Sequence, residues 1–321
     1  MAPFFSVIVP AYNAAPYVGE TVESVLGQSC EDLELIVVDH GSEDETRAVV
    51  EALADERTRT FSIPQSGRPA VARNYGIGRA SGKFVAFLDA DDTWHPEKLK
   101  RCREVIDQQG AEFLFTNLRY MDRESRLGPV GGPSRFGRND LLPKGDPLFL
   151  VWNMAACSSV VVSRALLERF PFDERRELAT FEDHFLWLRL HREVPLHYLP
   201  EHLLNYRVHS ANAALGSRSR EHIDRYYDLV LEEGLFCRRE VELARNLDYL
   251  AIGWRRGSIR ALAGSLLSLG WDLRKPSRGL LLRWVKHRLR AGLLRKIKSR
   301  IVHRTPVLGS RAGKKVSVGW R

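Results

Sequence analysis

The sequence predicts an α/β domain built on a mostly parallel sheet flanked by helices, with a helical extension at its C-terminal end. Three observations indicate this fold class. Apolar strand-like runs alternate with helix-like segments through the first hundred residues. Several of these runs are apolar on both faces, which is typical of parallel strands covered by helices. Beyond residue 210 the pattern is helical, so we expect a sheet domain over residues 1–215 and a basic helical region over residues 216–321.

The first part of the sheet domain should alternate strands and helices joined by right-handed crossovers. Its predicted strands are residues 6–10, 33–39, 61–63, 83–89 and 112–118, and its predicted helices are residues 16–28, 70–80 and 95–109. Ser42 and Glu45 stand three residues apart after the second strand. This spacing predicts a capping box at the start of one more helix.

The second part of the chain is less regular. Residues 119–150 are rich in glycine and proline and predict a long loop or lid. The pattern then returns with a strand at 156–163, a short helix at 164–170, a helix at 181–193, and a strand or bent hairpin at 195–209. Helical segments follow at residues 217–238, 241–256, 258–269 and 278–303.

The charge of the chain is unevenly distributed. The 321 residues carry a formal net charge of +9, but residues 271–321 alone contain 16 Lys and Arg residues against one acid. The preceding 270 residues therefore have a net charge of −6. In residues 279–304 apolar side chains recur every three or four positions between the basic ones, which suits a helix lying on an anionic membrane surface. The alternative is an amphipathic helix packed on the sheet domain with its charges solvated.

Cysteine usage and hydropathy predict a cytoplasmic protein. The four cysteines are too scattered for a zinc cluster or a disulfide framework, so we expect reduced thiols. The first residues lack the basic region of a signal peptide. No uninterrupted apolar run reaches the roughly 18–20 residues needed to cross a bilayer. A peripheral position on the inner face of the membrane, through residues 279–304, is compatible with this prediction.

Three of the predicted parallel strands end in segments of unusual composition. They are Pro10, Ala11, Tyr12 and Asn13 after the first strand, Asp39 after the second, and Asp89, Asp91 and Asp92 after the fourth. Ligands of open α/β sheets bind outside the carboxyl ends of the strands. We therefore expect acids that are fifty residues apart in sequence to meet at one edge of the sheet.

A cation is expected among these acids. Asp89 and Asp91 project the same way if the strand geometry continues, and two close carboxylates repel unless a cation lies between them. A small number of oxygen ligands from the protein suits Mg²⁺ or Mn²⁺, whose remaining ligands would come from a substrate diphosphate. The chain has no glycine-rich phosphate-binding motif, so the metal should bind the phosphates, with Arg73 as a candidate to assist. The alternative is a solvated turn in which Asp92 or Thr93 caps the next helix.

Five segments, in this order and spacing, resemble the family 2 glycosyltransferases. They are VIVPAYNAAPYVGETVESVLGQS, IVVDHGSEDET, SGRPAVARNYGIGRASGKFVAFLDADD, FEDHFLWLRL and NYRVHSAN, which together cover about residues 4–215. The resemblance implies a GT-A fold, a nucleotide-sugar donor that is usually a UDP-sugar, a divalent metal, and inversion at the anomeric carbon. The acceptor would be a glycan or a lipid-linked sugar in cell-surface polysaccharide synthesis.

The resemblance also implies roles for individual residues. The segment from Pro10 to Asn13 would line the nucleotide pocket, and Asp39 would read the base. Asp89 and Asp91 would form the DxD motif, with Asp91 on the metal and Asp89 toward the ribose. Asp183 would be the catalytic base.

Three further residues carry open alternatives. His40 replaces the second acid that is usual after the second strand, which either changes the preference for uridine or only starts a turn. His209 is a candidate third metal ligand, beside Asp89 and Asp91, or a diphosphate contact, although a lone histidine at a strand end is more often simply hydrogen-bonded. Arg207 is expected to pair with phosphate or with Glu182.

Two other classes of function compete with this interpretation. The segment FLDADDT fits the motif of haloacid-dehalogenase-like phosphatases, in which Asp89 would be the nucleophile. That motif should follow the first strand of its domain, whereas three strands precede it here. A non-catalytic basic protein that binds membranes or nucleic acid is the second alternative. The tail lacks aromatic residues in an interleaved pattern, so we expect no specific nucleic-acid partner.

Overall fold

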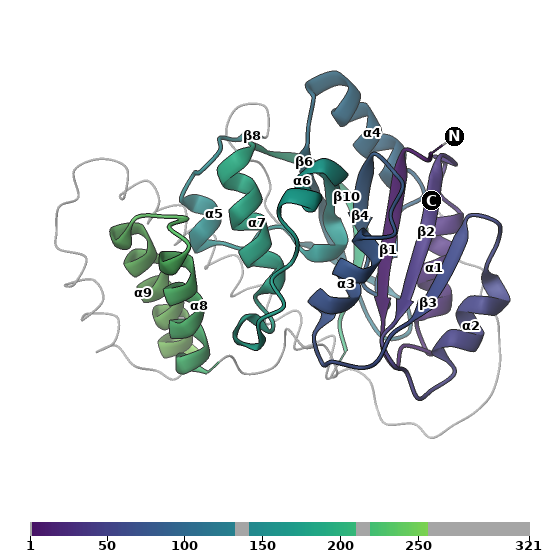
Figure 1. The fold of residues 1–321 in the computed structure, drawn as a ribbon, viewed down its shortest axis with the longest axis horizontal. Helices are drawn as coiled ribbons and strands as arrows, with labels where there is room; N and C mark the ends of the chain where they lie inside the picture. Colours follow the sequence, from purple (N-terminus) through teal and green to yellow (C-terminus); the bar gives the residue numbers. More distant parts are fainter. Residues whose placement is uncertain (1, 132–140, 210–218, 256–321) are drawn as a thin grey trace.

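The computed structural model describes residues 2–131, 141–209 and 219–255. Strands and helices alternate strictly up to residue 87 (Figure 1). The elements of the first part are β1 (Phe5–Ala11), α1 (Val18–Leu26), β2 (Leu33–Asp39), α2 (Thr46–Leu53), β3 (Thr58–Ser62), α3 (Pro69–Ile77), β4 (Phe84–Phe87), β5 (Thr93–Trp94) and α4 (Lys98–Gln109).

The second part adds strands to the same sheet and helices to its faces. Its elements are β6 (Phe113–Met121), β7 (Leu127–Gly131), β8 (Leu141–Leu142), α5 (Leu148–Val151), β9 (Val160–Ser163), α6 (Arg164–Arg169), α7 (Glu182–Glu193), β10 (Leu196–Arg207), α8 (Arg220–Glu232) and α9 (Arg238–Arg255). Single 3₁₀ turns occur at Cys157–Ser159 and Arg176–Leu178.

The sheet has the order β3-β2-β1-β4-β9-β6-β10-β5, with β7 and β8 at its borders. The pairs β2–β3, β1–β2 and β1–β4 are parallel, as predicted, and β6–β10 is parallel as well. Strand β9 lies antiparallel between β4 and β6, and β5 pairs antiparallel with β10. The mostly parallel sheet flanked by helices is therefore confirmed, and the direction of β9 is an addition that the sequence pattern did not reveal.

Both faces of the sheet are covered, which explains the apolar runs. Along β1, Val7 and Val9 pack on one face and Ile8 packs on the other. Helices α1, α2 and α4 contribute to the first of these cores, and α3, α6, α7, α8 and α9 contribute to the second. Figure 1 shows α8 and α9 beyond α7, on the side away from β3. Each large aliphatic or aromatic side chain buried in this way contributes about 1.5–3 kcal/mol of transfer free energy.

Two local predictions are wrong. Ser42 and Glu45 do not form a capping box, because α2 begins at Thr46, and the Ser42 hydroxyl accepts a hydrogen bond from the Asn13 N–H (3.0 Å) instead. The segment 119–150 is not one long loop, because β6 extends to Met121 and β7, β8 and α5 follow it. Strand β7 was not predicted because it contains Pro129, yet proline is tolerated in a strand that pairs on one side only.

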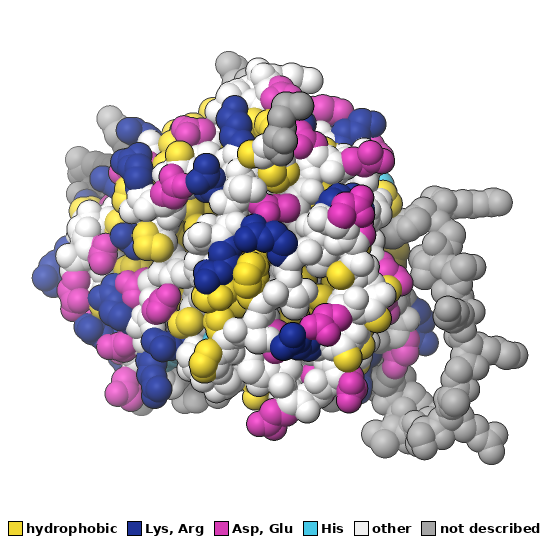
Figure 2. All heavy atoms as spheres, turned by 45° about the vertical axis from the view of Figure 1, so that its right-hand side comes forward, with side chains coloured by type: hydrophobic (Ala, Val, Ile, Leu, Met, Phe, Trp, Pro, Cys, Tyr) yellow, Lys and Arg dark blue, Asp and Glu magenta, His cyan; other side chains and the backbone are white. Residues whose placement is uncertain are grey.

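The C-terminal region is described only in part. Helices α8 and α9 confirm the first two predicted helical segments, while the segments at 258–269 and 278–303, and with them the basic stretch 279–304, lie outside the described residues. In the part of the chain that is described, no helix is both long and apolar enough to pass through a membrane. On the face of the molecule drawn in Figure 2, acidic and basic side chains are interspersed.

Candidate active site

The predicted convergence of three strand ends is confirmed. Asp39 is the last residue of β2 and lies opposite Ala11 at the end of β1. Strand β4 also runs parallel to β1, with Phe87 opposite Ile8, and the acidic loop that begins at Asp89 follows directly. Because these strands point the same way, Asp39 and the loop after β4 lie at one edge of the sheet.

The loop after β1 is held to the end of β2 by hydrogen bonds. Asn13 has a positive φ of 46°, its N–H donates to Ser42 Oγ (3.0 Å), and its Oδ1 accepts from the Glu43 N–H (2.9 Å). Asp39 is buried and accepts from the Ser42 N–H (3.1 Å) and the Ser62 hydroxyl (3.3 Å). Tyr12 remains 49% exposed beside them. These hydrogen bonds join the loop after β1 to the segment that follows β2.

His40, which follows Asp39, has a structural role. Its Nε2 accepts the Ser66 N–H (2.9 Å), so the ring is neutral with its proton on Nδ1. The Ser66 hydroxyl lies at the same distance from Nε2. Burial lowers the pKa of His40, and the nearby Arg68 adds to this effect, while Asp39 opposes it. At the position where the resemblance implies a second acid, this chain therefore has an uncharged ring. The ring holds the loop after β3 by its hydrogen bond with Ser66.

Arg73 on α3 connects two acids that are distant in sequence. Its Nη2 donates to Oδ1 of Asp89 (2.8 Å) and its Nη1 donates to Oε1 of Glu182 (3.1 Å). Burial raises the pKa of both carboxyl groups, and the Arg73 charge opposes that rise. The sequence suggested that Arg73 assists phosphate binding, but the structure commits both of its terminal nitrogens to protein acids. Arg73 is also the contact that places the start of α7 next to the acidic loop.

Replacing Arg73 with methionine should lower the free energy of unfolding by about 3 kcal/mol, because the change leaves two carboxylates without their cation. We place the estimate at the low end of the range for buried pairs because the Asp89 side chain is 35% exposed. Urea denaturation at pH 7.5 measures the effect. Arg47→Met is the control, since its ion pair with Glu51 is exposed and screened by solvent, so its loss should change stability far less. Equal losses for the two variants would contradict the bridging role.

Asp91 and His209, two of the predicted metal ligands, lie together. His209 Nε2 is 2.9 Å from Asp91 Oδ2, and the ring of His209 stacks on Tyr17 with 5.0 Å between centroids. Among the described residues, no three His, Cys, Asp or Glu side chains are arranged to hold a metal. The Asp91 carboxylate and the His209 imidazole still fit Mn²⁺ or Mg²⁺ as two neighbouring ligands, because these ions take their remaining ligands from water and substrate phosphates. The third predicted ligand, Asp89, is bound to Arg73.

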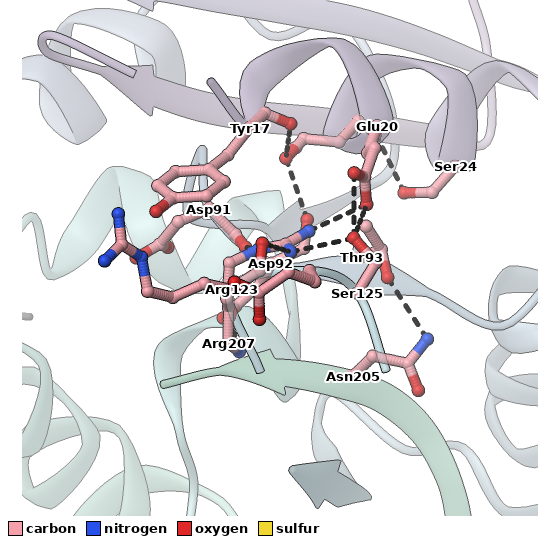
Figure 3. Close-up of polar contacts among 12 residues, drawn as sticks. Tyr17, Glu20, Ser24, Asp91, Asp92, Thr93, Arg123, Ser125, Asn205 and Arg207 are labelled. Carbon is pink, nitrogen blue, oxygen red and sulfur yellow. Dashed lines mark hydrogen bonds and ion pairs between the residues drawn. The ribbon is translucent and has the colours of Figure 1, made fainter. Parts of the chain in front are cut away.

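Asp92 does not cap the following helix, so that alternative is wrong. It is 1% exposed, and its Oδ1 accepts the backbone N–H of Arg207 on β10 (2.8 Å). Burial and the charges of Asp91 and Asp89 raise its pKa well above the usual range. The Thr21 hydroxyl of α1 is 2.8 Å from the Asp92 carbonyl oxygen. Figure 3 shows this loop between α1 and the end of β10. The loop is thus fixed from both sides.

Lys98, which the sequence gave no reason to select, is fully buried. Its Nζ donates to the Ser159 carbonyl (2.9 Å) and to Thr116 Oγ1 (3.3 Å), over the ring of Trp94. The neighbouring Ser158 hydroxyl accepts the N–H of Asp89 (3.0 Å). Adjacent residues of one backbone segment therefore contact Lys98 and the acidic loop. Burial lowers the pKa of Lys98 to about 8.

The buried Lys98 should make stability depend on pH in the alkaline range. Its folded-state pKa of about 8 lies below its usual value of 10.5, so the unfolded chain binds more protons between these values and stability rises with pH. Relative to Lys98→Met, wild-type stability should increase by about 2 kcal/mol from pH 7.5 to 9.5. Urea denaturation of both proteins at the two pH values measures this. A constant difference, or a falling one, would show that Lys98 is not desolvated.

Asp183, the predicted catalytic base, lies in the first turn of α7 beside Glu182. The Glu182 side chain is buried against Arg73, whereas Asp183 is half-buried. This difference follows from the angle of about 100° between successive residues of a helix. Both ring nitrogens of His184 are bonded, Nε2 to the Phe149 carbonyl oxygen and Nδ1 to the Tyr226 hydroxyl, each at 2.8 Å. These contacts hold the start of α7 in place.

Comparison with known sequences gives a consistent class of relatives. The family described as Glycosyl transferase family 2 matches residues 6–162. The chain is 28% identical over 254 residues to the UDP-Glc:alpha-D-GlcNAc-diphosphoundecaprenol beta-1,3-glucosyltransferase WfgD of Escherichia coli, which covers 78% of this chain and 94% of that protein. It is 30% identical over 294 residues to an uncharacterized glycosyltransferase of Nostoc sp., and the alignment covers 83% of this chain and 88% of that protein. It is 40% identical over 124 residues to the putative teichuronic acid biosynthesis glycosyltransferase TuaG of Bacillus subtilis, of which it spans about half the length.

Solved structures share the fold. TarS 1–349 of S. aureus in complex with UDP-GlcNAc superimposes with a TM-score of 0.61 at 21% identity, covering 76% of this chain and 70% of that one. The mannosyltransferase PcManGT of Pyrobaculum calidifontis, in complex with GDP-Man and Mn²⁺, gives a TM-score of 0.53 at 19% identity, covering 89% and 87%. At these identities the likeness establishes the GT-A fold of the sheet domain and nothing about its ligands.

Proposed function

Because the chain belongs to glycosyl transferase family 2, we propose that this glycosyltransferase moves a sugar from a UDP-sugar to a lipid-linked acceptor, with inversion at the anomeric carbon. The relatives support a role in polysaccharide or glycolipid synthesis, since WfgD acts on a diphosphoundecaprenol-linked sugar and TuaG is assigned to teichuronic acid biosynthesis. The family assignment replaces the two alternative interpretations, the haloacid-dehalogenase-like phosphatase and the non-catalytic basic protein.

One observation carries the proposal. The contacts Asp89–Arg73–Glu182 bring the helix that bears Asp183 to the acidic loop after β4. A donor held at that loop and an acceptor beside Asp183 would therefore share one site. The two groups that the reaction needs, a diphosphate-binding edge and a proton acceptor, come from segments about ninety residues apart in sequence.

The roles of the residues follow from this arrangement. Asp39 and the segment from Pro10 to Asn13 would hold the nucleoside. A divalent cation bound by Asp91 and His209 would supply positive charge for the leaving diphosphate. Asp183 would accept the proton of the acceptor hydroxyl as it attacks the face opposite the diphosphate, which inverts the anomeric carbon. Glu182 and Arg73 position this base; neither needs to touch the substrate.

The nucleotide base is the least constrained part of the proposal. TarS is solved with UDP and UDP-GlcNAc, whereas PcManGT is solved with GDP-Man. We favour uridine because WfgD, a relative aligned over 94% of its length, uses UDP-Glc. The hydrogen bonds between His40 and Ser66 support a loop-anchoring role for His40, so the missing acid is not an argument against uridine.

The acceptor proposal also gives a use to the basic stretch 279–304. A lipid-linked acceptor lies in a membrane, and a cationic amphipathic helix would keep the enzyme at its surface. This part of the proposal rests on the sequence pattern and on the lipid-linked substrate for which WfgD is named.

A turnover assay tests the proposed function. The full chain is incubated with Mn²⁺, a UDP-sugar and a short-chain polyprenyl-diphosphate-linked GlcNAc, and released UDP and glycosylated product are measured. We expect UDP and product in equal amounts from at least one UDP-sugar, and none after Mn²⁺ is chelated. Consumption of GDP-sugars alone would correct the donor. No transfer from any nucleotide sugar, together with hydrolysis of a simple phosphomonoester, would overturn the proposal.

A further inference from the structure

Arg207, at the end of β10, forms its ion pair with Glu20 and not with Glu182, which pairs with Arg73 instead, and its guanidinium is bonded within the protein. It is fully buried, and all three of its side-chain nitrogens donate hydrogen bonds. Nε donates to the Asp91 carbonyl (2.6 Å), Nη1 to the Asp122 carbonyl (3.2 Å) and Ser125 Oγ (2.9 Å), and Nη2 to Glu20 Oε2 (2.8 Å). Figure 3 shows these contacts converging on one guanidinium. Arg207 therefore ties the acidic loop, α1 and the β6–β7 turn together.

The β6–β7 turn, residues 122–126, is rigid for the same reason. The Asp122 N–H donates to the Arg126 carbonyl (3.1 Å), and the Ser125 N–H donates to the Asp122 carbonyl (3.2 Å). The Ser125 hydroxyl also contacts both carboxylate oxygens of Glu20 (2.6 and 2.8 Å). Arg126 closes the turn on itself by ion pairs with Asp122 (2.7 Å) and Glu124 (3.0 Å). The charges of this turn are thus satisfied within it, with one exception.

That exception is Arg123. Its side chain is exposed and, within the part of the chain that the structure describes, makes no ion pair or hydrogen bond. Its backbone carbonyl lies 3.4 Å from Arg207 Nη1, and the same guanidinium bonds the Asp91 carbonyl, so Arg123 and Asp91 are held by one side chain. In Figure 3 the Arg123 side chain extends out of the hydrogen-bonded network on the side of Asp91 and Tyr17.

A cation in this position is suited to an anion supplied by the substrate. Arg207 fixes the backbone of Arg123, so binding need not order this segment of the chain, and a guanidinium can donate two parallel bonds to phosphate oxygens. We propose that Arg123 binds a substrate diphosphate beside Asp91. The inference rests on the proposed function and deepens it, because a diphosphate occurs both in the donor and in a polyprenyl-diphosphate acceptor.

The test compares Arg123→Gln with Arg126→Gln, which removes a charge from the same turn. Isothermal titration with UDP in the presence of Mn²⁺ examines the donor, and titration with a short polyprenyl diphosphate examines the acceptor. Arg123→Gln should weaken binding of one of these probes about tenfold, and Arg123→Lys should restore part of it. The Arg126 variant should bind both probes as the wild type does. The probe that loses affinity identifies which diphosphate Arg123 contacts.

The outcomes separate this inference from the function on which it rests. If the wild type binds UDP and Arg123→Gln binds both probes with unchanged affinity, the Arg123 assignment is wrong and the proposed function stands. An equal loss in Arg126→Gln would also overturn the assignment, because it would point to the overall charge of the turn. If the wild type binds neither probe, the proposed UDP donor and lipid-linked acceptor fail together with the Arg123 assignment. Circular dichroism of each variant confirms that the fold is intact.

Discussion

Asp183→Asn should reduce the rate of sugar transfer by about 10²–10⁴-fold, the usual contribution of a positioned general base, while nucleotide binding stays unchanged. The amide has nearly the shape of the carboxylate and can still accept the His184 N–H (2.6 Å) in the first turn of α7. It cannot take a proton from the acceptor hydroxyl. Steady-state release of UDP measures the rate, and titration with UDP measures the binding.

Two matched changes define this result. Asp228→Asn removes an acid from α8 that pairs with Arg245, and should leave transfer unchanged. Glu182→Gln removes the charge that faces Arg73, so it should lower the rate less than Asp183→Asn does, through a misplaced helix start. A Glu182 variant that loses all transfer while the Asp183 variant remains active would assign the base to Glu182 instead.

Asp91→Asn should abolish the part of nucleotide binding that depends on metal. The substitution keeps the size of the side chain and a contact with His209, but it removes the negative charge that a divalent cation requires. We expect UDP affinity in the presence of Mn²⁺ to fall about 100-fold, to the value measured without metal. Isothermal titration of both proteins, each with and without Mn²⁺, gives the four constants needed.

Replacing His209 tests whether the metal site has two protein ligands. His209→Ala should lose at least tenfold in Mn²⁺-dependent UDP affinity if its imidazole is a ligand. A variant with full metal-dependent affinity would leave His209 as the ring that stacks on Tyr17 and orients Asp91. Asp91→Asn with undiminished Mn²⁺ dependence would refute the metal assignment altogether.

The edge of the sheet where the acids meet could be predicted because it depends on short-range rules. Strand type follows from apolar runs, and parallel strands end at one edge, so Asp39 and Asp89 had to converge. The fold class, the helix that carries Asp183, and the long strand that ends at Arg207 followed in the same way. Five sequence segments in register then gave each of these positions an expected role.

The partners of the buried charges could not be predicted, because they depend on tertiary packing. Arg73 and Glu182 are 109 residues apart, and nothing in either local sequence specifies the pair. Arg207 pairs with Glu20, a residue of α1 that carried no signal. Lys98 has the sequence context of an ordinary first-turn lysine of a helix, yet it is fully buried and bonded to Thr116 and Ser159. The direction of β9 has the same origin, since an apolar run does not encode its orientation.

The central claim is that the shared edge of β1, β2 and β4 binds a nucleotide diphosphate through a divalent cation. Thermal shift of the full chain with UDP and with GDP, each with and without Mn²⁺, tests it most directly. We predict that UDP raises the melting temperature only slightly by itself and by several degrees with Mn²⁺, and that Asp39→Asn and Asp91→Asn lose the larger shift. Unchanged melting temperatures in wild type with either nucleotide, whether or not Mn²⁺ is added, would contradict the claim.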